Sequence, residues 1–320
     1  IFLSKLYIIT AISDIFWNIN FNENKMNKNK VLIIAEAGVN HNGDIKKAFQ
    51  LIDAAVEAGA NIIKFQTFKA DEMILPNTRS ANYQIKNIKS NKSQYELLNS
   101  LELTNEMHLK IIDYCKIKEI EFLSSAFSVE SLNYLIKLGI KRIKIPSGEI
   151  TNLPYLEKAS SLDFPIIIST GMSTLSEVKD ACEILTSSGL KKEKLTLLHC
   201  TSNYPASLKS INLNAMNLMA EKLSIDIGYS DHSLSNETSI AAVALGATVI
   251  EKHITIDKNL YGPDHLASLE PKEFKQLVSS IRKVELIMGK RKKFPNSVEI
   301  KNALLVRKSI VAATKIRKGE

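Results

Sequence analysis

The sequence predicts a (β/α)8 barrel, the TIM-barrel fold, for most of its 320 residues. From Val31 onward, short apolar runs of strand length alternate with segments whose apolar residues recur with a period near 3.6. Eight such strand-then-helix units follow one another, as a parallel barrel requires. An open doubly wound sheet is the alternative, but the first turn, residues 38–43, lacks the G-x-G-x-x-G spacing usual there.

Each unit can be located by its apolar run and by the periodic segment that follows. The predicted strands are residues 31–38, 61–68, 121–127, 142–149, 165–170, 195–202, 226–233 and 247–255. The predicted helices are residues 44–59, 104–119, 129–139, 174–189, 235–246 and 271–289, with a shorter one at 153–161 and a weaker one at 212–222. Most of these helical segments are bounded by a glycine, which commonly ends a helix.

The regions outside this alternation indicate the domain organisation. We expect a barrel domain over 26–290, a linker over 291–302, and the start of a second, small domain over 303–320. Met26 stands just before the first strong strand, so we expect residues 1–25 to be an unstructured leader that is not native to the protein. The connection over 69–103 is long and polar, which is typical of a lid or a substrate wall.

Composition excludes several classes of protein. The formal net charge is +8, but the excess lysine is scattered over helix surfaces and predicts no nucleic-acid partner. Cys115, Cys182 and Cys200 have no C-x-x-C spacing, which favours a reducing, cytoplasmic location over a disulfide scaffold. No apolar run approaches the roughly 18 residues of a membrane span, and Asp14 interrupts the apolar start, which argues against a signal peptide.

Every predicted strand is apolar where it begins and polar where it ends. The strand ends carry Glu36, Lys64, Gln66, Ser124, Ser125, Lys144, Ser147, Glu149, Ser169, Thr170, His199, Thr201, Ser202, Ser230, Asp231, His232, Glu251, Lys252 and His253. Buried polar groups are costly without partners, and the carboxyl ends of barrel strands meet at one face. The pattern therefore predicts one convergent polar pocket.

His232 and His253 end neighbouring strands and are candidate ligands for one divalent metal ion. Asp231 lies beside the first in the sequence, and Glu251 lies near the second. Two imidazoles that leave positions open for oxygen ligands suit Mn²⁺ or Mg²⁺ better than structural zinc. The alternative for either histidine is a hydrogen-bonded core residue.

Lys64 and Lys144 at the strand ends predict a bound anion, because a buried unpaired lysine is costly. Serine and threonine hydroxyls at neighbouring strand ends complete a cradle for phosphate or carboxylate. Internal ion pairs with Glu36 or Glu149 are one alternative, and an imine-forming lysine, as in barrel aldolases, is another. Glu149 is also a candidate general base. In later loops, Asp264 and Tyr204 are candidates to hold sugar hydroxyls.

At these residues the sequence closely resembles the sialic acid synthase family, from residue 31 to 320. The motifs that carry the resemblance are AEAGVNHNGD (35–44), IKFQTF (63–68), KIPSGE (144–149), STGM (169–172), HCTSNYPA (199–206), GYSDHS (228–233), EKHIT (251–255) and GPDHLASLEP (262–271). The final VRKSIVAATKIRKGE looks like the opening of that family's antifreeze-like domain.

The resemblance implies condensation of phosphoenolpyruvate with N-acetylmannosamine or a close 2-acetamido sugar, and release of phosphate by C–O cleavage. Legionaminate and pseudaminate synthesis are the alternatives within the family. It implies that a metal on His232 and His253 polarises the aldehyde and that Glu149 positions the water. It also implies phosphoenolpyruvate ligands at Lys64, Ser125, Lys144, Ser147, Ser169 and Ser230, and sugar ligands at Glu36, Gln66, Ser202, Tyr204 and Asp264.

The resemblance further implies a domain-swapped homodimer. In the family, an arginine from the antifreeze-like domain of the partner subunit caps the sugar site, and we expect that stretch to lie beyond Glu320.

Overall fold

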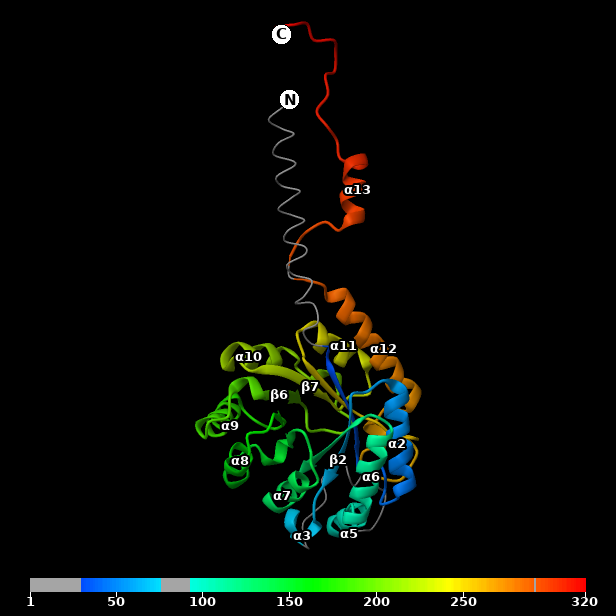
Figure 1. Ribbon diagram of the computed structural model, residues 1–320, viewed down its shortest axis with the longest axis vertical. Helices are drawn as coiled ribbons and strands as arrows, with labels where there is room; N and C mark the ends of the chain where they lie inside the picture. Colours follow the sequence, from blue (N-terminus) through cyan, green and yellow to red (C-terminus); the bar gives the residue numbers. More distant parts are fainter. Residues whose placement is uncertain (1–29, 76–92, 291) are drawn as a thin grey trace. The chain divides into compact units, whose positions relative to one another are not determined.

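The computed structural model describes residues 30–75, 93–290 and 292–320, and it confirms the predicted barrel (Figure 1). Eight parallel strands close on themselves in chain order, with β1 paired to both β2 and β8. The strands are β1 (Leu32–Gly38), β2 (Ile62–Thr67), β3 (Glu121–Ala126), β4 (Ile143–Ile145), β5 (Ile166–Ser169), β6 (Leu195–Cys200), β7 (Asp226–Asp231) and β8 (Val249–His253). All eight predicted strands are present.

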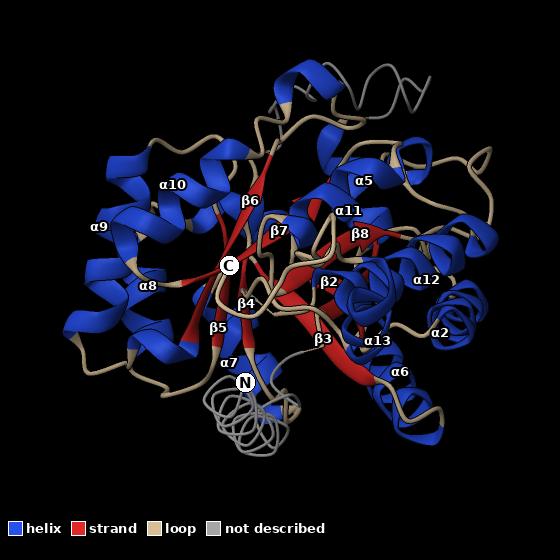
Figure 2. Cartoon of the chain, turned by 90° about the horizontal axis from the view of Figure 1, so that it is seen from above, coloured by secondary structure: helices blue, strands red, loops and turns tan. Residues whose placement is uncertain are grey.

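Helices of the first unit, which extends to Ile287, surround the strands, as Figure 2 shows from above, and the described helices of the whole chain include one more, α13. They are α2 (Ile45–Ala58), α3 (Ala70–Met73), α5 (Gln94–Leu101), α6 (Asn105–Ile117), α7 (Val129–Lys137), α8 (Leu153–Ser160), α9 (Leu175–Ser187), α10 (Asn214–Leu223), α11 (Asn236–Ala244), α12 (Pro271–Met288) and α13 (Ser297–Val306). The connection predicted as a long polar loop contains α3 and α5. The Ser93 side chain and Glu96 form a capping box that starts α5.

Local signals explain where the first helix begins and ends. The Asp44 side chain accepts a hydrogen bond from the backbone N–H of Lys46 and so caps α2. At the other end, Gly59 has φ 83°, a left-handed conformation that glycine adopts without strain. The chain then turns back into β2, as the sequence predicts.

The barrel interior is apolar below the strand ends. Side chains that alternate along the strands form an inner cluster, namely Leu32, Ile34, Ile62, Leu123, Ile167, Leu198 and Val249. Gly228 leaves room for this cluster, because a Cβ there would lie 2.5 Å from Leu198 Cδ2. The residues between them, such as Ile33, Ile63 and Ile250, face outward into the larger core beneath the helices. One face of each strand is thus directed into the barrel.

The chain divides into two units, one that extends to Ile287 and one over Met288–Glu320. Within the second unit, residues 297–302 of the predicted linker belong to α13, and residues 307–320 form no strand. Asn296 accepts hydrogen bonds from the backbone N–H groups of Val298 and Glu299, and this cap favours a helix where we expected a linker. The predicted leader, residues 1–25, lies outside the described residues. None of the helices described is both long and apolar enough to cross a membrane.

Candidate active site

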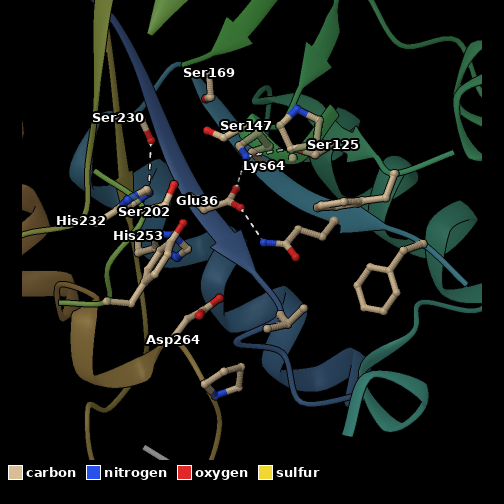
Figure 3. Close-up of a pocket in the computed structure, with 18 of the residues that line it drawn as sticks. Glu36, Lys64, Ser125, Ser147, Ser169, Ser202, Ser230, His232, His253 and Asp264 are labelled. Carbon is tan, nitrogen blue, oxygen red and sulfur yellow. Dashed lines mark hydrogen bonds and ion pairs between the residues drawn. The ribbon is translucent and has the colours of Figure 1, made fainter. Parts of the chain in front are cut away.

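A pocket of about 480 Å³ opens where the carboxyl ends of the strands meet (Figure 3). Its polar floor lies one pleat above the inner apolar cluster, because successive side chains on a strand point to opposite faces. The floor consists of one side chain from each strand, namely Glu36, Lys64, Ser125, Lys144, Ser169, Cys200, Ser230 and Glu251. The predicted convergence of the strand ends is therefore present.

Two lysines and two carboxylates of the floor form a connected set of ion pairs. Lys64 Nζ lies 3.0 Å from Glu36 Oε2 and 3.5 Å from Glu251 Oε2, and Lys144 Nζ lies 3.9 Å from Glu251 Oε2. The ion pair between Lys64 and Glu36, which the sequence offered as an alternative to a bound anion, is thus formed. The register of parallel strands places Glu36 opposite Lys64. Glu251, on β8, joins the two lysines from the far side.

Hydroxyl groups complete the floor. Lys64 Nζ donates to Ser125 Oγ at 3.1 Å, and Lys144 Nζ donates to Ser169 Oγ at 2.6 Å. The Ser230 hydroxyl donates to Glu251 Oε1 at 3.0 Å. Each cation therefore lies beside a hydroxyl that can rotate to donate to an incoming anion.

The environment gives the two carboxylates opposite pKa shifts. Burial raises the pKa of Glu36 to about 7, although Lys64 opposes the shift. Burial also acts to raise the pKa of Glu251, but Lys144 and Lys64 outweigh it and lower that pKa to about 2. Glu251 is thus a permanent anion near neutral pH, whereas Glu36 exchanges a proton there. A divergent pair of this kind is typical of acid–base sites.

The lysines also differ. Burial would lower the pKa of Lys64, but Glu251 and Glu36 outweigh it and the pKa is raised. Burial lowers the pKa of Lys144, and the more distant Glu251 does not restore it. Lys144 is therefore the cation whose charge is least compensated by protein groups, and an anionic ligand would stabilise it most.

The two predicted imidazoles lie side by side. The ring centroids of His232 and His253 are 5.6 Å apart, and the Tyr204 ring lies 4.1 Å from the first and 5.7 Å from the second. His232 Nδ1 bonds the Thr201 carbonyl oxygen at 2.7 Å, so Nδ1 carries the proton and Nε2 keeps its lone pair. His253 Nδ1 is buried and has no hydrogen-bond partner among the described residues.

These features fit a pair of metal ligands. Burial lowers the pKa of His232 to about 4 and that of His253 well below its usual value, so both rings are neutral at pH 7. Neutral imidazole nitrogens bind divalent metals. Within the part of the chain that the structure describes, no group of three or more His, Cys, Asp or Glu side chains is arranged to hold a metal. A metal on His232 and His253 would therefore take its remaining ligands from water or substrate.

The predicted sugar ligands also line the pocket. Gln66 Nε2 donates to Glu36 Oε1 at 3.2 Å, and Ser202, Tyr204 and Asp264 border the same space. Burial raises the pKa of Asp264 to about 6, with Lys64 opposing the shift. Gln66, Asp264 and Glu36 lie close together around Gly38, where a Cβ would come within 3.3 Å of Gln66 Nε2 and Glu36 Oε1 and 3.6 Å of Asp264 Oδ2.

Glu149 is not among the residues that line the pocket. β4 ends at Ile145, and Ser147–Glu149 form a 3-10 turn in which Glu149 Oε2 accepts a hydrogen bond from Asn152 Nδ2 at 2.6 Å. No ion pair between Lys144 and Glu149 forms among the described residues. The turn brings Ser147 into the pocket but turns Glu149 towards the start of α8.

Asp231 and Lys252, which alternate with the pocket residues, face away from the pocket. They form an ion pair at 2.9 Å in which both side chains are 0% exposed. Asp231 Oδ2 also accepts from Thr238 and Ser239 of α11. The expectation that Asp231 and Lys252 join the convergent pocket is therefore wrong, because Asp231 shares the outward face of β7 with Tyr229.

The sequence predicts Glu251 at the convergent strand ends but assigns it no role in the site, and it does not predict Cys200 there. The signal was present in the alternation along β8, where Glu251 and His253 share one face and Lys252 the other. Likewise, Cys200 shares the inward face of β6 with Leu198.

One side of the pocket is an apolar wall from the connection after β2 and its surroundings. This apolar wall consists of Val39, Phe68, Met73, Leu97, Leu101 and Phe127. The residues from α3 and α5 confirm that this connection borders the pocket, as predicted for a substrate wall. The pocket thus has a charged floor and an apolar side.

Comparison with known proteins identifies relatives over most of the chain. The sequence model of the NeuB family matches residues 51–293. The chain is 49% identical to the N,N'-diacetyllegionaminic acid synthase of Campylobacter jejuni over 91% of this chain and 87% of that protein. It is 48% identical to the synthase of the same name from Legionella pneumophila, over 90% and 81%. The crystal structure of N-acetylneuraminic acid synthetase from Leptospira borgpetersenii, in complex with citrate, superimposes with a TM-score of 0.76 at 35% identity, over 88% and 94%.

Proposed function

Because the chain belongs to the NeuB family, we propose that it condenses phosphoenolpyruvate with an open-chain 2-acetamido sugar and water. The products are a nonulosonic acid and phosphate. The observation that carries this proposal is the floor of the pocket, where Lys64 and Lys144 lie among hydroxyls beside two neutral imidazoles. That arrangement offers an anion site and a carbonyl site within one pocket.

In this proposal, Lys64, Lys144 and the hydroxyls of Ser125, Ser147, Ser169 and Ser230 hold phosphoenolpyruvate. Lys144 has the least compensated charge, so it gains most from the ligand's phosphate or carboxylate. Glu251 holds the two lysines in place. Its negative charge also makes the floor selective, so that it does not bind every small anion equally well. Gln66, Tyr204 and Asp264 hold the sugar, together with Ser202, which lies at the border between the two ligands beside Ser147.

His232 and His253 are the residues that would hold a divalent metal ion, Mn²⁺ or Mg²⁺. When bound there, such an ion supplies Lewis-acid polarisation of the sugar's aldehyde oxygen. The hydrogen bond from His232 Nδ1 to Thr201 directs the other ring nitrogen towards the pocket. Tyr204, whose ring lies 4.1 Å from that of His232 at a tilt of 33°, covers the pair from the sugar side.

The condensation forms a bond between C3 of phosphoenolpyruvate and the aldehyde carbon, and the aldehyde oxygen gains a proton. Water then adds to C2 and loses one proton, and as the C2–O bond to phosphate breaks, the added oxygen loses its second proton and becomes the C2 carbonyl. Of these two protons, one goes to the former aldehyde oxygen and one to phosphate. We assign the proton transfers to Glu36 in place of Glu149, because Glu36 lies in the pocket and exchanges a proton near neutral pH. Glu36 takes the proton from the water and returns one to the departing phosphate.

For the sugar, we propose 2,4-diacetamido-2,4,6-trideoxymannose, which leads to N,N'-diacetyllegionaminate, ahead of N-acetylmannosamine. Two relatives named for that product are 49% and 48% identical to this chain over the 291 and 289 residues aligned. The apolar wall supports the choice, since a methyl group at C6 packs there without loss of hydration, whereas a hydroxymethyl group would lose hydrogen bonds to water.

We further propose a cytoplasmic homodimer in which residues 303–320 begin a second domain, as the resemblance implies.

The test is phosphate release from phosphoenolpyruvate by the purified full-length protein with Mn²⁺, against a panel of 2-acetamido sugars. We expect release with the diacetamido sugar at higher kcat/KM than with N-acetylmannosamine, and none after EDTA treatment. Failure with every sugar would overturn the proposal. Borohydride trapping of a lysine–substrate adduct that survives EDTA would instead support the imine-forming aldolase.

A further inference from the structure

Three strand ends meet at one corner of the pocket floor, around the hydroxyl of Ser147. Gly171, just after β5, donates its backbone N–H to Ser147 Oγ at 3.0 Å. Cys200, the last residue of β6, has its Sγ 3.3 Å from the same oxygen. In the part of the chain that the structure describes, these are the hydrogen-bond partners of the Ser147 hydroxyl.

The corner is built for close approach. A Cβ added to Gly171 would lie 2.8 Å from Ser147 Oγ, 3.0 Å from Cys200 Sγ and 2.3 Å from Ser202 Oγ. Contacts below 3.0 Å are not tolerated, so any side chain at position 171 would push these three groups apart. The backbone N–H of Gly171 reaches Ser147 only because the position is glycine.

The two partners set the direction of the Ser147 hydroxyl. A serine hydroxyl has one hydrogen to donate and two lone pairs to accept. The Gly171 N–H occupies one lone pair. Burial raises the pKa of Cys200, so the thiol keeps its hydrogen and is available to occupy the other. The hydroxyl hydrogen is then left for a group in the pocket.

We infer that Cys200 is a positioning residue, whose thiol, together with the Gly171 N–H, fixes the Ser147 oxygen as an acceptor and leaves its hydrogen to be donated to the bound anion. Lys144 provides charge at the same floor, and Ser147 adds a directed hydrogen bond. The inference rests on the proposed function, because it needs an anionic ligand there. A buried cysteine usually acts as a small apolar residue, whereas this inference assigns the Cys200 thiol a specific hydrogen bond.

The experiment measures binding of phosphoenolpyruvate alone, without sugar, by titration calorimetry on the full-length protein. The variants are Cys200→Ala, Cys200→Ser, Ser147→Ala and the double variant Cys200→Ala/Ser147→Ala. Cys182→Ala is the matched control, since Cys182 is buried in the core behind the barrel and does not line the pocket.

We expect Cys200→Ala to weaken binding about 3- to 10-fold, the range of one hydrogen bond, while Cys200→Ser restores it to within about twofold. In the double variant, loss of Cys200 should add little to loss of Ser147, because the thiol acts through that hydroxyl. In turnover assays the KM for phosphoenolpyruvate should rise in Cys200→Ala with little change in kcat. Gly171→Ala should weaken binding in the same way.

Equal binding by wild type and Cys200→Ala would overturn the inference and leave the proposed function intact. So would additive losses in the double variant, or a Cys200→Ser protein as weak as Cys200→Ala. If the wild-type protein bound no phosphoenolpyruvate, both the proposed function and this inference would fall. If Cys200→Ala did not fold, Ser147→Ala and Gly171→Ala would carry the comparison, and failure of both to weaken binding would overturn the inference.

Discussion

The imidazole rings of His232 and His253 lie with their centroids 5.6 Å apart, on the adjoining ends of β7 and β8. Both rings are neutral, and each keeps a nitrogen lone pair for a ligand. We therefore propose the two rings as metal ligands: His253 Nδ1 is buried without a hydrogen-bond partner among the described residues, and His232 Nε2 has the Ser230 hydroxyl as a neighbour at 3.4 Å.

The first prediction concerns these two rings. Replacing either with asparagine should weaken Mn²⁺ binding by about 100-fold or more, since loss of a supporting group alone typically costs 10- to 100-fold. The free Mn²⁺ signal in electron paramagnetic resonance measures this binding without turnover. His108→Asn is the control, because His108 bonds Thr67 outside the pocket and should leave Mn²⁺ binding unchanged. Unchanged affinity in both site variants would exclude the metal site.

The second prediction contrasts the two lysines of the floor. Lys64→Met should destabilise the protein by about 3 kcal/mol or more, because it leaves Glu36 buried without a cation and leaves Glu251 with the more distant Lys144 alone. Lys144→Met should destabilise the protein much less, because the ion pair of Lys144 offsets little of the free energy that its burial costs. Both should lose affinity for phosphoenolpyruvate. Urea unfolding measures the free energy of unfolding of each variant. Equal destabilisation by the two substitutions would contradict the predicted difference between Lys64 and Lys144.

The third prediction concerns pH and Glu36. The folded-state pKa of this carboxyl is about 7, above its ordinary value of 4.5, so the folded protein binds the proton more tightly than the unfolded chain does. The contribution of Glu36 is therefore most favourable below pH 4.5 and is lost as pH rises through about 7.

Glu36→Gln removes this titration. We therefore expect the stability of wild type relative to Glu36→Gln to fall between pH 4.5 and 7, as measured by urea unfolding at several pH values. Asp264 shifts in the same direction, but it is present in both proteins and cancels in the difference. A constant difference over this range would show that Glu36 is not the buried titrating group.

The fourth prediction concerns the apolar wall. Met73→Gln should raise the KM for the diacetamido sugar by about 5-fold or more, since one apolar contact in a pocket contributes about tenfold or more to discrimination. The KM for N-acetylmannosamine should change less, because its C6 hydroxyl gains a polar neighbour. Met288→Gln, an exposed position on α12, is the matched control. An equal change in KM for both sugars would show that the groups in which they differ do not bind at the apolar wall.

The fifth prediction concerns Asp231, which faces away from the pocket. Asp231→Ala should destabilise the protein by about 3 to 5 kcal/mol, because it leaves Lys252 buried and unpaired. Once folded, the variant should bind phosphoenolpyruvate as the wild type does. A stable variant with weakened binding would place Asp231 in the site after all.

Much of the site could be predicted from the residues, and the exceptions have two causes. Asp231 and Lys252 lie on the outward face of their strands, so the alternation along β7 and β8 removes them from the pocket. Glu149 lies beyond the end of β4, in a 3-10 turn that brings Ser147 into the pocket and leaves Glu149 bonded to Asn152.

The sequence by itself determined the eight strands, the helices between them and the end of the barrel at which the polar residues gather. These are local properties, since the periods of 2 and 3.6 and the change from apolar to polar are written along each segment. Only the tertiary structure decided which strand-end side chains share the pocket and at what distances. Glu251 lies between Lys64 and Lys144 because closure of the barrel sets a register between strands far apart in the chain, and electrostatic shifts depend on those separations.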